Sequence, residues 1–171
     1  MLYQSSVPVF LRYLEQLKTF IDIAEAHSRS TGTSEFEILN ARLAPDMLPF
    51  ETQIQIAASF TLRASYPLAG ELVPPYDDNV VIYPSSFDGL RARLLHTATL
   101  LRALSEDSFK AAASRTVVSQ AGNATVALPA QEFLLQYALP NFFFHVTTAY
   151  AIMRHQGVKI GKMQFDGFHG Y

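Results

Sequence analysis

The sequence contains no cysteine among its 171 residues. This absence excludes a disulfide framework, a catalytic thiolate and a zinc site built on thiolates. It also fits a reducing compartment, and residues 1–6 lack the basic segment and apolar block that begin a secretory signal. We therefore expect a cytoplasmic protein.

Clustered positive charge and long apolar runs are also scarce. The formal net charge is −2 and no long run of Lys or Arg is present, so nucleic acid is not an expected partner. No uncharged apolar run reaches the roughly 18 residues needed to cross a bilayer. Residues 133–153 come closest, but polar side chains such as Gln136, Asn141 and His145 interrupt them. We interpret this segment as a core helix and expect no membrane partner.

Length and composition fit one domain spanning residues 1–171, because 49% of the residues are hydrophobic and can supply a full core. In four long segments the apolar residues recur at steps of three and four, the period of amphipathic helices. We expect these helices at residues 7–32, about 49–64, 85–104 and about 130–155.

Local signals mark the connections between these helices. Residues 66–84 contain four prolines, Gly70 and the polar run 77–79, and they predict a long loop, a kind of segment that often walls a pocket. The segments 116–120 and 124–128 flank a Gly-Asn turn and predict a small hairpin. Ser34 and Glu37 form a capping box for a short helical turn. The sequence therefore predicts an all-α fold: a four-helix bundle with a long loop between the second and third helices and a small β-hairpin before the last.

The last helix carries the most informative polar pair, Asn141 and His145. Four residues apart on a helix, their side chains project next to each other. Pro140 lies directly before them and is expected to kink the helix. The imidazole is either a core group satisfied by its neighbours or part of a binding pocket, and the sequence leaves both open.

Two further groups are candidates for a site. His96 lies beside the apolar stripe of the third helix, so it can turn inward toward His145 and, with a carboxylate, hold a metal. Arg42 lies in a turn with Asn40 and Asp46, where it either pairs with Asp46 or binds the carboxylate or carbonyl of a ligand. No Gly-x-Ser-x-Gly elbow and no glycine-rich phosphate loop is present.

Three runs of residues, 6–14, 40–49 and 139–158, together carry a family resemblance. They resemble an uncharacterised family of unknown function within the DinB/YfiT-like superfamily of four-helix bundles. The resemblance implies a bundle fold. Many members of that superfamily bind a divalent metal through three histidines, some are thiol-dependent transferases or isomerases, and many are dimers.

The superfamily motif on the last helix is His-x-x-x-His. Matching the end of that helix places its second histidine on His145 and its first on Asn141, and the third ligand falls near Gln55 on the second helix. Two of the three imidazoles are thus replaced by amides, which bind transition metals poorly. The resemblance therefore implies a degenerate metal site.

These observations favour a protein that binds a small organic molecule in a pocket lined by Gln55, Asn141 and His145, with Arg42 holding an anionic group and no cofactor. His145 is the expected proton carrier in an acid/base-assisted isomerisation, cyclisation or transfer, although the sequence names no reaction. One alternative is a zinc- or nickel-dependent enzyme. The other is a non-enzymatic interaction module. We expect a homodimer, which the second alternative builds on the aromatic tail: Phe165, Phe168 and Tyr171.

Overall fold

The computed structural model describes residues 1–74 and 83–170. The fold is mostly helical and contains one small antiparallel sheet. Its helices and strands, in chain order, are α1 (Val7–Thr31), α2 (Glu35–Asn40), α3 (Phe50–Ala69), α4 (Phe87–Arg102), the 3-10 turns Glu106–Phe109 and Ala112–Ser114, β1 (Thr116–Ala121), β2 (Ala124–Pro129), α5 (Ala130–Glu132), a π-helical segment (Phe133–Ala138), α6 (Leu139–His155) and α7 (Lys162–Asp166).

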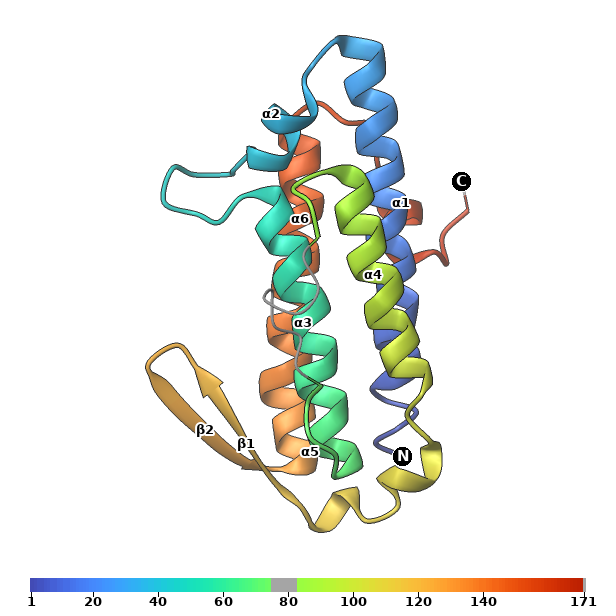
Figure 1. The fold of residues 1–171 in the computed structure, drawn as a ribbon, viewed down its shortest axis with the longest axis vertical. Helices are drawn as coiled ribbons and strands as arrows, with labels where there is room; N and C mark the ends of the chain where they lie inside the picture. Colours follow the sequence, from blue (N-terminus) through green and yellow to red (C-terminus); the bar gives the residue numbers. More distant parts are fainter. Residues whose placement is uncertain (75–82, 171) are drawn as a thin grey trace.

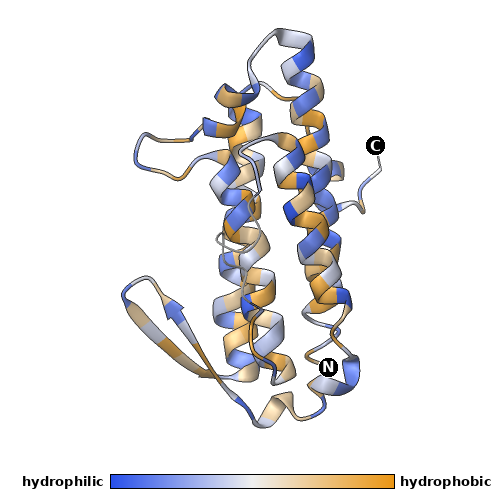
Figure 2. Cartoon of the chain, viewed as in Figure 1, coloured by the Kyte–Doolittle hydropathy of each residue, from blue (hydrophilic) through white to orange (hydrophobic). Residues whose placement is uncertain are grey.

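The four long helices α1, α3, α4 and α6 lie along the long axis of the molecule (Figure 1). Helix α3 packs on both α6 and α4, and α1 packs mainly on α4. Orange and blue residues alternate along α1 and α4 in Figure 2, as in amphipathic helices with one face toward a core. Each large side chain that is fully buried contributes roughly 1.5–3 kcal/mol. The largest are Phe10, Phe20, Phe50, Phe133 and Phe142.

The first helix and the turn after it are confirmed. Helix α1 begins at Val7, and Gly32 ends it in the left-handed conformation, with φ of 76°. In the capping box of α2, the backbone N–H of Glu37 donates to Oγ of Ser34, and the Ser34 N–H donates to the Glu37 carboxylate. These bonds satisfy backbone donors that have no partner within the helix.

The boundaries around the long loop need correction. Helix α3 continues to Ala69, past the predicted end at residue 64, and contains Pro67 in its last turn. Burial of Tyr66, Leu68 and Ala69 against the core outweighs the hydrogen bond that Pro67 removes. Helix α4 begins at Phe87. Between α3 and α4 the structure describes residues 70–74 and 83–86, which contain no helix or strand, and the predicted loop residues 75–82 lie outside the described residues.

The last helix is divided where we expected a kink at Pro140. The π-helical segment Phe133–Ala138 precedes α6, and Pro140 occupies the first turn of α6. Pro140 has no N–H for the carbonyl of Gln136, and its ring crowds that carbonyl. The wider π turn accommodates both effects, so the helix type changes directly before Pro140.

The hairpin is confirmed. Strands β1 and β2 pair from Thr116–Pro129 to Ala121–Ala124 around a two-residue turn. Arg63 of α3 and Tyr137 of the π segment both donate to the carbonyl of Gln120, which attaches the hairpin to these helices.

The chain after α6 packs on α1. The ring of Phe165 lies edge-on to Tyr13 and to Tyr150, with ring centroids 5.6 Å apart in both pairs. The guanidinium of Arg12 lies 3.9 Å from the ring centroid of Phe168. Tyr171, the third predicted contact residue of the tail, lies outside the described residues. Among the helices of residues 1–74 and 83–170, none is long and apolar enough to cross a bilayer.

Candidate functional site

The polar contact that joins α3 to α6 is between Gln53 and His145. Nδ1 of His145 lies 2.7 Å from Oε1 of Gln53. Gln53 is buried, with 2% of its surface exposed, and His145 is partly buried. Gln53 comes from the first turn of α3, and His145 lies one and a half turns into α6.

A second hydrogen bond fixes the orientation of the Gln53 amide. Its Nε2 donates to the backbone carbonyl of Leu48, at 3.0 Å. A carbonyl accepts only, so the NH2 group must face Leu48 and the amide oxygen must face His145. The oxygen in turn requires a proton on Nδ1 of the imidazole. Neutral His145 is therefore the Nδ1–H tautomer, and its Nε2 carries a lone pair.

Aromatic side chains surround the imidazole. Phe60 of α3 stacks on it, with ring centroids 6.0 Å apart and 27° between the planes. Phe144 lies edge-on at 5.1 Å and is 56% exposed, so it is an apolar group at the border between the imidazole and solvent. Arg63 covers the ring of Phe60, at 4.7 Å from its centroid.

Burial lowers the pKa of His145 from 6.5 to about 4, because the low-dielectric surroundings disfavour the imidazolium. Gln53 offers an oxygen but no negative charge to offset this loss of solvation. At neutral pH the ring is therefore uncharged. The neutral imidazole can accept a hydrogen bond or a proton at Nε2. Its one ring proton, on Nδ1, is already bonded to Gln53, so the ring has no acidic proton to give to a ligand.

The structure shifts the predicted residue on α3 by two positions. Nε2 of Gln55 donates to Glu51, at 3.2 Å, and it is Gln53 that contacts His145. Two residues on a helix differ by about 200° in direction, so the two glutamines face opposite sides. Asn141 does lie one turn before His145, and its Nδ2 donates to the carbonyl of Tyr137 at 2.7 Å.

The other predicted residues make separate contacts. Nη1 of Arg42 donates to the carbonyl of Met47, at 2.6 Å, and so braces the segment that supplies the Leu48 carbonyl. Nδ1 of His96 lies 2.5 Å from the hydroxyl of Tyr83. Neither of these bonds involves His145, and neither joins Arg42 to Asp46.

The donor set around His145 does not fit a transition metal. It offers one imidazole and two amides, and both amides are engaged in the hydrogen bonds described above. Within residues 1–74 and 83–170, no three His, Asp or Glu side chains lie close enough together to hold a metal ion. Among these residues, His96 and His145 do not form a metal site with a carboxylate, so this alternative is not supported.

Gln53 was not among the residues selected from the sequence, although a signal was present. It lies three residues after Phe50 and four before Ala57, both of which are fully buried. A glutamine in the apolar stripe of a helix needs a buried polar partner. Asn141, His145 and His96 are amide and imidazole side chains that the sequence allows to face inward from the other long helices.

Comparison with known proteins matches the chain to a protein family and to a solved structure. Residues 2–166 match the family model of DUF1993, a domain of unknown function. A crystal structure of a DinB family member protein from Shewanella denitrificans is similar to the whole chain. It has a TM-score of 0.88 and 35% identity, and the match covers 100% of this chain and 94% of that one. No curated protein matches the chain.

Proposed function

Because the chain belongs to the family defined by DUF1993, a domain of unknown function, we propose its activity from the site itself. We propose a DinB/YfiT-like four-helix bundle, in one domain and acting as a homodimer, that binds a small organic molecule at His145. The bound molecule offers an O–H or N–H group to Nε2 of the imidazole. Gln53 takes the place that we first gave to Gln55.

One observation carries this proposal: the chain of hydrogen bonds from the Leu48 carbonyl through Gln53 to Nδ1 of His145. A satisfied core histidine has both ring nitrogens bonded. Here, among residues 1–74 and 83–170, Nδ1 has its partner and no bond to Nε2 is found. The buried amide thus holds the ring in one tautomer whose acceptor nitrogen remains for another molecule.

The surroundings of the imidazole favour a ligand that is largely apolar. Phe60 and Phe144 provide ring faces and edges, and the burial that lowers the pKa of His145 to about 4 also disfavours a bound cation. A neutral ligand with an aromatic or aliphatic body and one donor matches both features. Where the bound molecule reacts, in an isomerisation, cyclisation or transfer, Nε2 accepts its proton and Asn141 orients its polar group.

The proposal is tested with two probes that differ by one donor. Phenol has an O–H that anisole lacks, while both have the same ring. We expect phenol to shift the NMR resonances of the His145 ring in a saturable manner, with a much smaller effect of anisole at equal concentration. Equal responses to both probes, or no response to phenol and related O–H or N–H compounds, would contradict the proposal.

Two variants locate the effect. His145→Phe keeps an aromatic ring of similar size but removes the acceptor, so phenol binding measured by calorimetry should weaken at least about tenfold, the equivalent of one hydrogen bond of about 1.4 kcal/mol. Gln55→Ala is the matched control on the opposite side of α3 and should bind as the wild type does. A loss of binding in Gln55→Ala that equals the loss in His145→Phe would point to a different site.

A further inference from the structure

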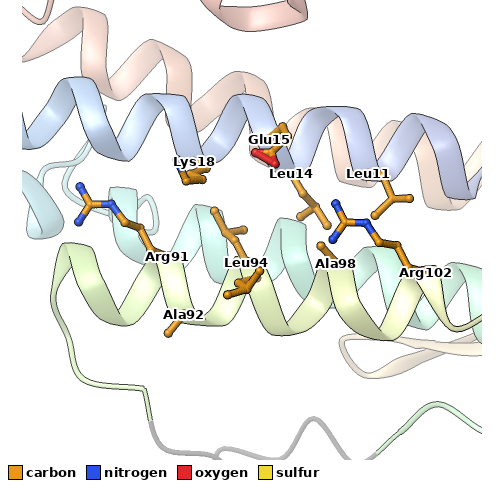
Figure 3. A pocket seen from close by; sticks show the side chains of 10 residues that line it. Leu11, Leu14, Glu15, Lys18, Arg91, Ala92, Leu94, Ala98 and Arg102 are labelled. Carbon is orange, nitrogen blue, oxygen red and sulfur yellow. The ribbon is translucent and has the colours of Figure 1, made fainter.

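A second feature of the surface lies between α1 and α4, away from the Gln53–His145 contact. Figure 3 shows the two helices side by side, with Leu11 and Leu14 of α1 opposite Leu94 and Ala98 of α4. These residues line a hollow of about 230 Å³, together with Ala92 and Leu95. Four charged side chains line it as well: Glu15, Lys18, Arg91 and Arg102. An apolar cavity of about 150 Å³ already holds a benzene ring, so this hollow has room for a large aliphatic side chain.

Helix α4 carries an exposed stripe beside this hollow. Ala92, Leu95 and Thr99 are all exposed, and Leu95 exposes 66% of its surface. The stripe has a negatively charged residue, Asp88, at one end and a positively charged residue, Arg102, at the other. Asp88 lies seven residues before Leu95 and Arg102 lies seven residues after it, so both share its face of the helix.

We propose that this surface binds a second copy of the chain, with the two α4 helices antiparallel and crossing at Leu95. The symmetry of the stripe selects this occupant. Asp88 and Arg102 are each about 10.5 Å from Leu95 along the helix axis. A two-fold axis at Leu95 therefore places Asp88 opposite Arg102 of the partner subunit, and it forms the same pair a second time.

The apolar centre and the charged ends have different roles. Leu95 of each subunit enters the hollow of the other, which removes apolar surface from water. The two exposed ion pairs add little affinity, but they select the antiparallel orientation because a parallel arrangement places like charges together. Asp88 is available for this role. Its neighbour Arg91 also bonds to Asp22 and Glu25 of α1, so Arg91 keeps two carboxylates when Asp88 turns to the partner.

This inference specifies the surface of the homodimer proposed above and does not depend on the chemistry of His145. It also differs from a dimer built on the aromatic tail. Phe165 is already packed between Tyr13 and Tyr150 of its own chain, and Phe168 lies against Arg12. The α1–α4 surface has unfilled apolar space, whereas the described part of the tail is covered by its own subunit.

The test exploits the reciprocal pairing. In Arg102→Glu the symmetric interface would contain two Asp–Glu contacts, and in Asp88→Arg it would contain two Arg–Arg contacts. Each variant alone should dissociate at least about tenfold more readily than the wild type. An equimolar mixture restores both opposite-charge pairs, so the mixture should dimerise as the wild type does. Sedimentation equilibrium between about 1 and 300 μM measures all three samples.

Two further variants complete the design. Leu95→Asp places two carboxylates on the symmetry axis and should be monomeric over the same range. Lys159→Glu is the control, an equal charge reversal on an exposed residue outside this surface, and should leave the dimer unchanged. A wild type that is monomeric throughout overturns both the homodimer and this surface. A dimer that is insensitive to the three α4 changes, or a mixture that stays monomeric, overturns the surface alone.

Discussion

Oε1 of Gln53 accepts a hydrogen bond from Nδ1 of His145, at 2.7 Å, while Nε2 of the same side chain donates to the carbonyl of Leu48. A backbone carbonyl before α3 thereby decides which nitrogen of an imidazole on α6 carries the proton. The consequence reaches the function, because the unprotonated Nε2 is the group that we propose to meet a ligand. The predictions below begin with this contact.

The first prediction concerns the protonation of His145. We expect the ring to be the Nδ1–H tautomer at pH 7 and to titrate with a pKa of about 4, because burial disfavours its charged form. Nitrogen NMR of the ring distinguishes the two tautomers and follows the titration. A proton on Nε2 at pH 7, or a midpoint near the ordinary value of 6.5, would show that the described contact does not govern the ring.

Replacing the amide by a carboxylate should reverse the effect of burial. In Gln53→Glu, a negative charge faces Nδ1 at hydrogen-bond distance, so the pKa of His145 should rise by about one to three pH units. Gln55→Glu adds the same charge two residues along α3, on the side of Glu51. The pKa of His145, measured by NMR titration, should change far less in this control. Equal increases in both variants would mean that long-range charge and not contact sets the pKa.

Arg91 should stabilise the packing of α1 on α4. Its Nε lies 2.8 Å from Asp22, its Nη1 lies 2.7 Å from Asp88, and its Nη2 bonds to Glu25. We expect Arg91→Gln to lower the free energy of unfolding by about 1 kcal/mol at low salt, and by less at about 1 M salt, where the charges are screened. Urea denaturation at monomeric concentration measures both values.

Arg29→Gln is the control for that measurement. Arg29 pairs with Glu25 of its own helix and has a side chain that is 77% exposed. Its loss should cost less than about 0.5 kcal/mol, since exposed pairs within one helix contribute little. Similar losses in the two variants would indicate that the Arg91 network adds nothing beyond an ordinary surface pair.

Asn141 should contribute to stability through the break in the last helix. Its Nδ2 donates to the carbonyl of Tyr137 in the π segment, and the side chain is partly buried. Asn141→Ala should cost about 1 kcal/mol in urea denaturation, because that carbonyl loses a donor. Asn40→Ala removes an equivalent bond, to the carbonyl of Phe36, at an exposed position. Water replaces that donor, so the control should cost less.

Local sequence patterns were sufficient for most of the fold. The apolar stripe from Phe10 to Ala24, the Ser34–Glu37 capping box and the Gly122 turn depend on residues close in sequence, and each was found where it was expected. The end of α3 depends on tertiary contacts instead. Pro67 is a local signal for a loop, but the burial of the residues around it keeps the helix intact.

The site was predictable only in part, for a similar reason. Helical spacing brings Asn141 and His145 to neighbouring positions, and this needs no knowledge of other helices. The residue opposite them depends on how α3 is rotated about its axis, and an error of two positions selects Gln55 in place of Gln53. The tautomer and the lowered pKa depend on the carbonyl of Leu48 and on desolvation, and no sequence motif encodes either.

The last prediction is the dependence of stability on pH. The pKa of His145 is about 4 in the folded state and ordinarily 6.5 when unfolded, so between these values the unfolded chain binds more protons. Stability from this residue is thus fully present above pH 6.5 and is lost as the pH falls toward 4. The full difference corresponds to about 3 kcal/mol, and access of water to the partly exposed ring reduces this to about 2 kcal/mol.

His145→Phe removes the titrating group and leaves the Gln53 oxygen unpaired, a cost that does not vary with pH. The free energy of unfolding of the variant, measured by urea denaturation, should therefore start lower at pH 7 and approach the wild-type value by pH 4. Parallel curves for the two proteins would show that His145 is solvated well enough to keep its ordinary pKa.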